Sequence, residues 1–253
     1  KWVGNYKSER AYDVNSNEIS NISFAWDTAT EAWLNQEKTE RSFDSEGKEL
    51  LETSYIWDNT NKVWIGGIKQ TYEYDDSGEC ISYVQYYWNK KISQWISINQ
   101  EEKNSAHEIT LFVYFQWNDS IEEWVGEVKY ESFFNSKNNK TKKIEYKWDT
   151  TTKQWINDWK IEYSYDSNDN NINVTEFNWE QETNSWINLD KTDNVFNEKN
   201  EITLTTYSSW DVATGLWINN TQEVNTYDSF GNKTGIIYKE WDTTLGQWAS
   251  TEK

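Results

Sequence analysis

Tryptophans recur in pairs along this chain, and the two members of each pair are seven residues apart. The pairs are Trp26/Trp33, Trp57/Trp64, Trp88/Trp95, Trp117/Trp124, Trp148/Trp155, Trp179/Trp186, Trp210/Trp217 and Trp241/Trp248. Their first members follow one another at 31 residues, with one interval of 29 between Trp88 and Trp117. Trp2 fits the same spacing, and Trp159 does not. A fixed period of this length is typical of a repeat protein. We therefore expect a single array of eight repeats over residues 1–253, with a partial unit at 1–17.

Composition limits the classes of partner. The formal net charge is −19, which repels phosphate backbones and anionic lipids, and no apolar run approaches a membrane span. We therefore expect neither nucleic-acid binding nor membrane insertion. One cysteine, Cys80, and one histidine, His107, leave no basis for an intrachain disulfide or a histidine-rich metal site, and we expect no cofactor.

Each repeat has a first turn that ends in a residue type suited to a left-handed backbone. Tyr74–Gly78 and Tyr227–Gly231 show the turn best. Its fourth position is Ser16, Gly47, Gly78, His107, Asn138, Asp169, Asn200 or Gly231, always ten residues before the next tryptophan. A type I turn followed by a left-handed residue needs positive φ there, which Gly and Asn tolerate. The pattern predicts a hairpin turn.

A second turn joins the two tryptophans of each pair, as in Trp210–Trp217. Asp or Asn follows the first tryptophan in most repeats, where its side chain can accept a hydrogen bond from a backbone N–H two residues on. The fifth loop position, such as Gly215, Asn184 or Lys62, again suits a left-handed residue. A tight hairpin places the paired tryptophans opposite each other.

Between the turns the alternation of residue types is that of strands. Tyr55 lies two residues before Trp57, and Tyr72 and Tyr74 share the parity of Trp64, whereas Lys69 has the other parity. We therefore expect one aromatic face and one largely charged face. The short repeat lacks two residues before His107, which keeps the alternation, whereas losing one would invert it.

These observations predict an all-β chain of tandem 31-residue β-hairpin repeats in a continuous antiparallel meander of about sixteen strands. Because strand twist accumulates and an aromatic face needs cover, we expect a coiled solenoid or barrel-like shell with the rings inside. A propeller is the alternative, but each blade would need two repeats.

The motif [YF]-D-S-x-G-N, the pattern Y-x-W-D-x-x-T-x-x-W and the segment Glu162–Asp166 resemble the tandem Trp/Tyr repeats of secreted and cell-surface proteins of Bacteroidota. That family often carries a C-terminal signal for type IX secretion, which this sequence lacks. The shorter pattern Y-x-Y-D-x-x-G-N is similar to the YD repeats of Rhs proteins, whose hairpins coil into shells. Those repeats lack the tryptophan pair. The resemblance implies an extracellular or cell-surface location and a non-enzymatic role.

No residue pattern in the sequence indicates a catalytic site or a metal-binding site. His107 sits at a turn position, and no phosphate-binding glycine loop or nucleophile elbow is present. The 43 acidic residues follow the repeat, so no carboxylate pair stands out. Asp166–Asn170 superficially resembles a calcium loop but corresponds to a hairpin turn in the other repeats. We expect no catalytic residues, no metal site and no enzyme.

Aromatic residues that depart from the repeat are the candidates for ligand contact, because exposed rings stack on sugars. They are Tyr83, Tyr87, Phe133, Tyr207 and Tyr238. The first functional hypothesis is an adhesin-like module that binds glycan or a surface protein. The alternative is a purely structural spacer or a self-associating shell, in which terminal strands pair with other copies.

Overall fold

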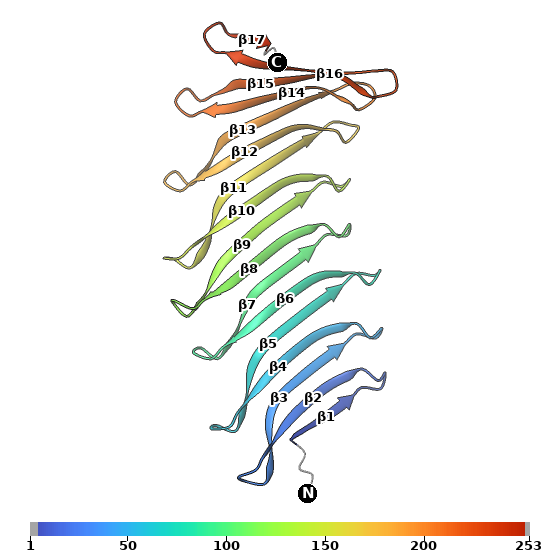
Figure 1. Ribbon diagram of the computed structural model, residues 1–253, viewed down its shortest axis with the longest axis vertical. Coiled ribbons are helices and arrows are strands. Elements are labelled where there is room, and N and C mark those ends of the chain that lie inside the picture. The colour runs from blue at the N-terminus through green and yellow to red at the C-terminus, as the bar shows by residue number, and fades with distance from the viewer. Residues whose placement is uncertain (1–4, 251–253) are drawn as a thin grey trace. The chain divides into compact units, whose positions relative to one another are not determined.

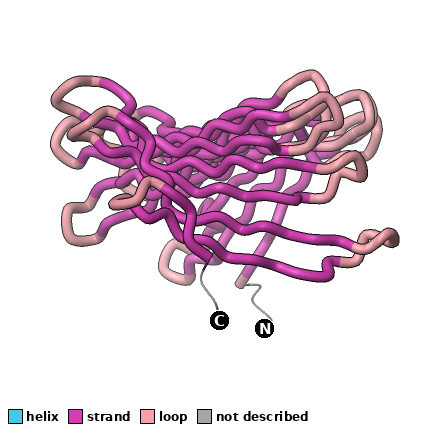
Figure 2. The backbone as a smooth tube through the Cα atoms, turned by 90° about the horizontal axis from the view of Figure 1, so that it is seen from above, coloured by secondary structure: helices cyan, strands magenta, loops and turns pink. Residues whose placement is uncertain are grey.

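The computed structural model describes residues 5–250, which form strands and tight turns with no helix among them (Figure 2). The predicted all-β class is confirmed. Trp2 lies outside the described residues. Since residues 5–250 hold no helix at all, none has the length and apolar content needed to cross a membrane. The chain divides into two units, residues 1–129 and 130–253, which are described separately.

Consecutive strands of the first unit lie side by side in sequence order (Figure 1). They are β1 (Tyr6–Tyr12), β2 (Glu18–Asp27), β3 (Ala32–Phe43), β4 (Glu49–Asp58), β5 (Val63–Tyr74), β6 (Cys80–Asn89), β7 (Gln94–Lys103) and β8 (Ile109–Asn118), followed by the beginning of β9 (Glu123–Phe134). From β1 to β8 each strand pairs antiparallel with the next. This unit is therefore a meander of hairpins.

The second unit repeats the arrangement (Figure 1). After the end of β9 come β10 (Lys140–Asp149), β11 (Gln154–Tyr165), β12 (Asn171–Glu180), β13 (Ser185–Phe196), β14 (Ile202–Asp211), β15 (Leu216–Tyr227), β16 (Lys233–Asp242) and β17 (Gln247–Ser250). Each pairs antiparallel with the next. Unbroken pairing over eight strands excludes four-stranded propeller blades. Within the described part of each unit the outermost strands do not pair, so each meander is open.

The first turn of every repeat has the predicted left-handed residue. Its φ is between 62° and 90° at Ser16, Gly47, Gly78, His107, Asn138, Asp169, Asn200 and Gly231. The Asp or Asn three residues earlier explains the turn. In the hairpin β5–β6, for example, Oδ1 of Asp75 accepts hydrogen bonds from the backbone N–H groups of Ser77 and Glu79. Gly78 N–H donates to the backbone oxygen of Asp75 at 2.9 Å and closes the turn.

The second turn is equally regular. The fifth loop residue has φ between 50° and 67° at Glu31, Lys62, Ser93, Glu122, Lys153, Asn184, Gly215 and Gly246. The paired tryptophans face each other across the hairpin, as Trp57 and Trp64 do. In all eight pairs the rings meet edge to face, with centroids 5.0–5.6 Å apart and planes at 66–72°. Such pairs contribute about 0.5–1.5 kcal/mol beyond their buried area.

In six hairpins a β-bulge follows shortly after the second tryptophan, and it changes which residues share a face from what the sequence parity predicts. Tyr55 pairs with Gly66, but Thr53 pairs with Lys69, so two steps along β4 match three along β5. The extra residue inverts the alternation of β5. Lys69 therefore shares the face of Trp64, which we call the tryptophan face. Tyr72 points to the opposite face, contrary to the expectation from sequence parity.

The expected interior lined with aromatic rings is also wrong, because few side chains of the described residues are buried. Among the described hydrophobic side chains only Ile98 and Ile161 are buried, each 7% exposed, and no large side chain is fully buried. The described tryptophans are half-buried, except Trp117, which is 40% exposed. The rings thus pack across hairpins and against neighbouring repeats, on sheets that remain accessible from both faces.

Side-chain contacts also link neighbouring repeats, in addition to the backbone pairing of their strands. The hydroxyl of Tyr74 donates to the backbone oxygen of Glu49, 25 residues earlier, and Tyr165 does the same to Lys140. On the tryptophan face, Lys69 Nζ lies 4.0 Å from the Tyr86 ring centre. The aromatic tyrosine of the first-turn motif therefore has a structural role: it links its own repeat to the preceding one.

Candidate functional site

The structure places the five predicted ligand-contact residues in different surroundings. Tyr238, Tyr207 and Phe133 are 53%, 42% and 39% exposed, and Phe133 lies beneath Lys142, whose Nζ is 4.0 Å from the ring centre. Tyr83 and Tyr87 are half-buried. These residues do not form one cluster, but Tyr207 and Tyr238 are brought together in the second unit.

Tyr83 and Tyr87 contact other rings of the first unit. The Tyr83 ring lies 5.4 Å from that of Tyr72 across β5 and β6, and the Gln70 amide donates to the Tyr83 hydroxyl at 3.0 Å. Burial raises the pKa of Tyr72 to about 12, so its hydroxyl stays protonated at neutral pH. Tyr87 lies 5.5 Å from the ring of Trp124. In the structure both side chains therefore pack against neighbouring aromatic rings.

Tyr207 and Tyr238 share one face on the two strands that flank β15. Tyr207 pairs with Thr221, and Tyr238 pairs with Glu223. Thr221 and Glu223 are two residues apart on β15, so all four side chains point to the same side of the sheet. By strand geometry the two tyrosines lie about 10 Å apart across β15, staggered by about 7 Å along it. We call Tyr207, Tyr238 and Glu223 the tyrosine platform.

The charged groups of the platform are only loosely paired. Glu223 accepts from Lys233 Nζ at 3.5 Å, the limit of a hydrogen bond, and Glu240 pairs with Thr221 in the register of β15 and β16. Two exposed phenol rings therefore flank a carboxylate that stays available for further hydrogen bonds. This combination suits a ligand with both apolar C–H surface and hydroxyl groups.

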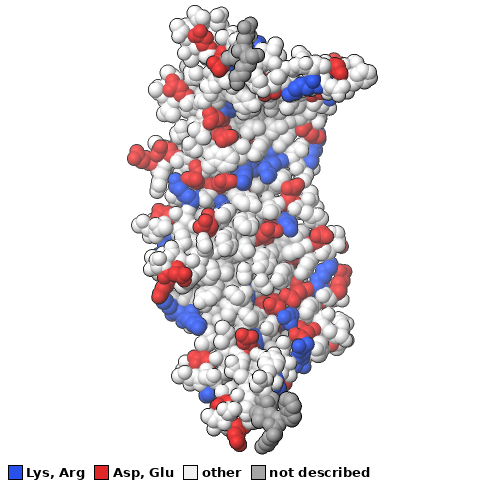
Figure 3. Space-filling view, viewed as in Figure 1, with Lys and Arg blue, Asp and Glu red and all other residues white. Residues whose placement is uncertain are grey.

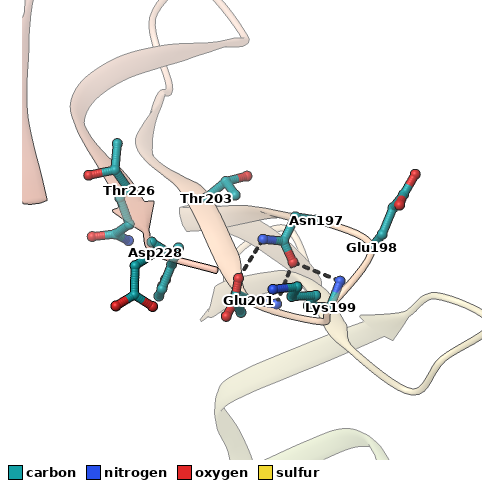
Figure 4. A pocket seen from close by; sticks show the side chains of 9 residues that line it. Asn197, Glu198, Lys199, Glu201, Thr203, Thr226 and Asp228 are labelled. Carbon is teal, nitrogen blue, oxygen red and sulfur yellow. Dashed lines mark hydrogen bonds between the residues drawn. The ribbon is translucent and has the colours of Figure 1, made fainter. Parts of the chain in front are cut away.

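A polar groove of about 510 Å³ continues from the platform toward the first-turn end of the second unit (Figure 4). Asn225, two residues beyond Glu223 and on the same face, is one lining residue. The others are Asn197, Glu198, Lys199, Glu201, Thr203, Thr226, Tyr227 and Asp228. Groove and platform thus form one surface of β14, β15 and β16 and the turns beside them, which we take as the candidate site.

Hydrogen bonds hold the walls of the groove in place. The Asn197 side chain accepts from the backbone N–H groups of Lys199 and Glu201 and donates to the Glu201 carboxylate at 2.6 Å (Figure 4). On the other wall, Asn225 Nδ2 and the Tyr227 hydroxyl both donate to the backbone oxygen of Ile202. The groove is therefore defined before any ligand arrives.

Electrostatically the candidate site is acidic. Hydrogen bonds from the side chain and backbone of Asn232 hold the pKa of Asp228 below its usual range, so this carboxylate is charged at neutral pH. Elsewhere on the face shown in Figure 3, lysines and arginines lie among carboxylates rather than in a continuous basic stripe. The acidic groups are dispersed, and residues 5–250 contain no cluster of three His, Cys, Asp or Glu side chains arranged to hold a metal ion.

The groove is the part of the site that the sequence does not reveal. Its residues belong to two turns 31 residues apart, and turns of this kind occur in every repeat. Asn225 gives no signal of its own, because Asn194 stands at the same position in the preceding repeat. The platform tyrosines, by contrast, stand out as departures from the repeat.

Comparisons with known proteins establish no family. No family model and no curated protein matches the chain. Among solved structures, a DUF3836 family protein from Bacteroides vulgatus is 18% identical with a TM-score of 0.31 over 38% of this chain and 92% of that one. A second DUF3836 protein, from Parabacteroides distasonis, is 25% identical with a TM-score of 0.29, over 37% of this chain and 88% of that one. A chain of the Photorhabdus luminescens Tc holotoxin pore is 10% identical with a TM-score of 0.35, over 97% of this chain and 14% of the toxin chain. At these TM-scores none of them carries a functional inference.

Proposed function

We propose that the chain is a non-enzymatic binding module whose ligand is a glycan held across Tyr207 and Tyr238. The observation that carries the proposal is the pair of tyrosines, 42% and 53% exposed, on one face of the sheet beside a polar groove. A ring exposed on a rigid strand gives contact area at little entropic cost. The dispersed carboxylates and the lack of a metal-binding cluster in the described residues favour binding over catalysis.

The chemistry of the candidate site favours a sugar over an extended apolar ligand. A pyranose ring has C–H faces that stack on phenol rings and hydroxyl edges that donate to carboxylates. Glu223 and Glu201 provide acceptors, and Thr203 adds a hydroxyl. A protein ligand would need a larger apolar surface than two rings offer.

A glycan array tests the proposal directly. The intact chain is compared with a double variant, Tyr207→Ala with Tyr238→Ala, and with Tyr12→Ala. Tyr12 is a matched control because it is a tyrosine of the first unit that is 54% exposed on β1. We expect binding to a subset of glycans that the double variant loses and Tyr12→Ala keeps. Uniformly flat responses from the unmodified chain would remove the glycan proposal.

We propose as the second candidate a structural spacer or self-associating segment. The hydrogen bonds between repeats favour it, because Tyr74, Tyr165 and Tyr227 each donate to a backbone oxygen 25 residues earlier. Such links suit a chain whose task is to span distance. Association of copies through terminal strands would belong to this role, and sedimentation at several protein concentrations would detect it.

We also propose that the protein is extracellular or lies at the cell surface. Its support is the resemblance of the repeat motifs to tandem Trp/Tyr repeats of secreted Bacteroidota proteins. The net charge of −19 and the interspersed charges also favour neutral or cationic partners over nucleic acid and anionic lipid. Detection of the native protein on intact cells with an antibody, before and after surface proteolysis, tests the location.

A further inference from the structure

The face that carries the tyrosine platform consists of rows of side chains across β14, β15 and β16. The strand registers place Tyr207, Thr221 and Glu240 in one row and Thr205, Glu223 and Tyr238 in the next. All six side chains point to one side of the sheet, because the members of each strand are two residues apart. Glu240 is two residues from Tyr238 on β16, and Glu223 lies directly across from Tyr238 on β15. Tyr238 therefore has carboxylates on two sides.

This combination is specific to one repeat. The position three residues before the first tryptophan of a pair is tyrosine in three repeats, at Tyr114, Tyr207 and Tyr238. On the preceding strand the first two face Asn99 and Thr192, and only Tyr238 faces a carboxylate. The position just before the first tryptophan is acidic only at Glu240. The other pairs have Ala25, Ile56, Tyr87, Gln116, Lys147, Asn178 and Ser209 there.

Negative charge around Tyr238 is only partly neutralised. Glu240 is exposed and makes no hydrogen bond or ion pair within the part of the chain that the structure describes. Glu223 is 3.5 Å from Lys233 Nζ, and the side chain of that lysine is 46% exposed. The adjoining groove adds three carboxylates and one lysine, Glu198, Glu201, Asp228 and Lys199 (Figure 4). An exposed phenol ring thus lies where carboxylates outnumber cationic groups.

A buried amide with an unpaired oxygen lies on the same face. Asn225 is 5% exposed and lines the groove. Its Nδ2 donates to the backbone oxygen of Ile202, but its Oδ1 has no hydrogen-bond partner. In the preceding repeat Asn194 accepts from the hydroxyl of Thr205, whereas Asn225 pairs with Ile236, which has no hydroxyl. The unpaired oxygen adds its partial negative charge to the wall of the groove.

We propose that the glycan held by this site is built of amino sugars whose amino groups are free and carry positive charge when protonated. This inference rests on the glycan-binding function proposed above and names the class of sugar. One sugar ring stacks its C–H face on Tyr238, and its ammonium group lies beside the carboxylates of Glu240 and Glu223. The carboxylates attract the cation, and the negative face of the phenol ring adds to that attraction. Acetylated sugars lack this charge, and acidic sugars reverse it.

Calorimetric titration with two matched oligosaccharides tests the inference. Chitosan hexasaccharide has free amino groups, and chitin hexasaccharide has the same backbone with every amino group acetylated. At mildly acidic pH we expect chitosan to bind about tenfold more tightly, and added salt to reduce the difference. Equal affinities, or tighter binding of chitin, would overturn this inference and leave glycan binding in place. Binding of neither would also overturn it, and the glycan array would then decide the proposed function separately.

Variants separate this site from attraction by the net charge of −19. Glu240→Gln keeps the shape of the side chain and should weaken chitosan binding about threefold, and chitin binding less. The matched control is Glu182→Gln, because Glu182 is exposed in the turn between β12 and β13, outside the platform. Tyr238→Ala should weaken both oligosaccharides, since stacking does not depend on the amino group. If Glu240→Gln and Glu182→Gln weaken chitosan binding equally, the preference comes from overall charge and the inference is wrong.

Discussion

The hydroxyl of Tyr74 donates a 2.9 Å hydrogen bond to the backbone oxygen of Glu49, 25 residues earlier in the chain. Tyr74 belongs to the first-turn motif at the end of β5, and Glu49 follows the corresponding turn one repeat before. The bond therefore joins two repeats in addition to the backbone pairing between their strands. Phenylalanine stands at the same place in other repeats, at Phe43, Phe134 and Phe196.

Tyr74→Phe should therefore lower the free energy of unfolding by about 1 kcal/mol while leaving the packing of the ring intact. Urea unfolding followed by circular dichroism measures the change. The control is Tyr12→Phe, because Tyr12 is 54% exposed and its hydroxyl makes no hydrogen bond in the structure. Equal effects of the two substitutions would show that the bond to Glu49 contributes nothing.

Gly66 is a second contact between repeats that can be tested. A Cβ atom there would lie 2.8 Å from the ring of Trp88 and 2.9 Å from that of Trp95. Gly66→Val should cost about 1–3 kcal/mol, because the ring pair of the next repeat must move. Gly215→Asn is the control, since no atom lies near its Cβ position and Asn184 occupies the same turn position in another repeat. A stable Gly66→Val variant would show that the ring pair does not pack on this backbone.

The lysines of the tryptophan face should stabilise the fold through cation–π contacts with the aromatic rings beneath them. Lys69→Met keeps the aliphatic stem but removes the ammonium that lies 4.0 Å from the Tyr86 ring centre and 5.5 Å from that of Trp95. We expect a loss of about 0.5–2 kcal/mol in the free energy of unfolding. Lys91→Met, in an exposed turn, should change it little. If the two variants melt alike, the ammonium over the rings is energetically neutral.

Acid should weaken the turn that contains Asp75. Its pKa is lowered, first by the hydrogen bond from the Ser77 side chain and next by the contact with His107 Nε2 at 2.8 Å. The folded pKa is below the unfolded value of about 3.9, so the carboxylate stabilises the fold above that pH and this contribution is lost as pH falls toward the folded pKa. The stability difference between the unmodified chain and Asp75→Asn should be largest near neutrality and shrink below about pH 4.

Asn stands at the same turn position at Asn104 and Asn135, so Asp75→Asn retains the turn geometry. Chemical unfolding at a series of pH values provides the curve. A stability difference that stays constant from neutral to acid pH would mean that the charge of Asp75 is not linked to folding.

Much of the fold follows from the sequence because turns are local. Positive φ at Gly78 and His107 needs only the residue type and its distance from the next tryptophan, and the structure confirms all eight first turns. The facing of Trp57 and Trp64 follows from the length of the loop between them. The shortening of the 29-residue interval falls in β7, as predicted from the constant distance between His107 and Trp117.

The faces could not be predicted, because the bulge leaves no mark in the sequence. The third residue after the second tryptophan is Gly67 in one repeat, Asp158 in another and Leu189 in a third. Backbone pairing with the neighbouring strand, rather than residue type, fixes the extra residue. Tyr207 and Tyr238 of the tyrosine platform could be predicted from the sequence, because both depart from the repeat pattern. The groove was not, because it depends on how two distant turns approach each other.

The bulge places lysines and tryptophans of successive repeats on one face of the sheet. Nuclear Overhauser contacts of the Lys69 side chain, in protein with labelled lysine and aromatic residues, report which face the lysine occupies. The structure predicts contacts from the Lys69 methylene protons to the rings of Tyr86 and Trp95. Contacts from Lys69 to the rings of Tyr72 and Tyr83 instead would place the lysine on the opposite face and contradict the account.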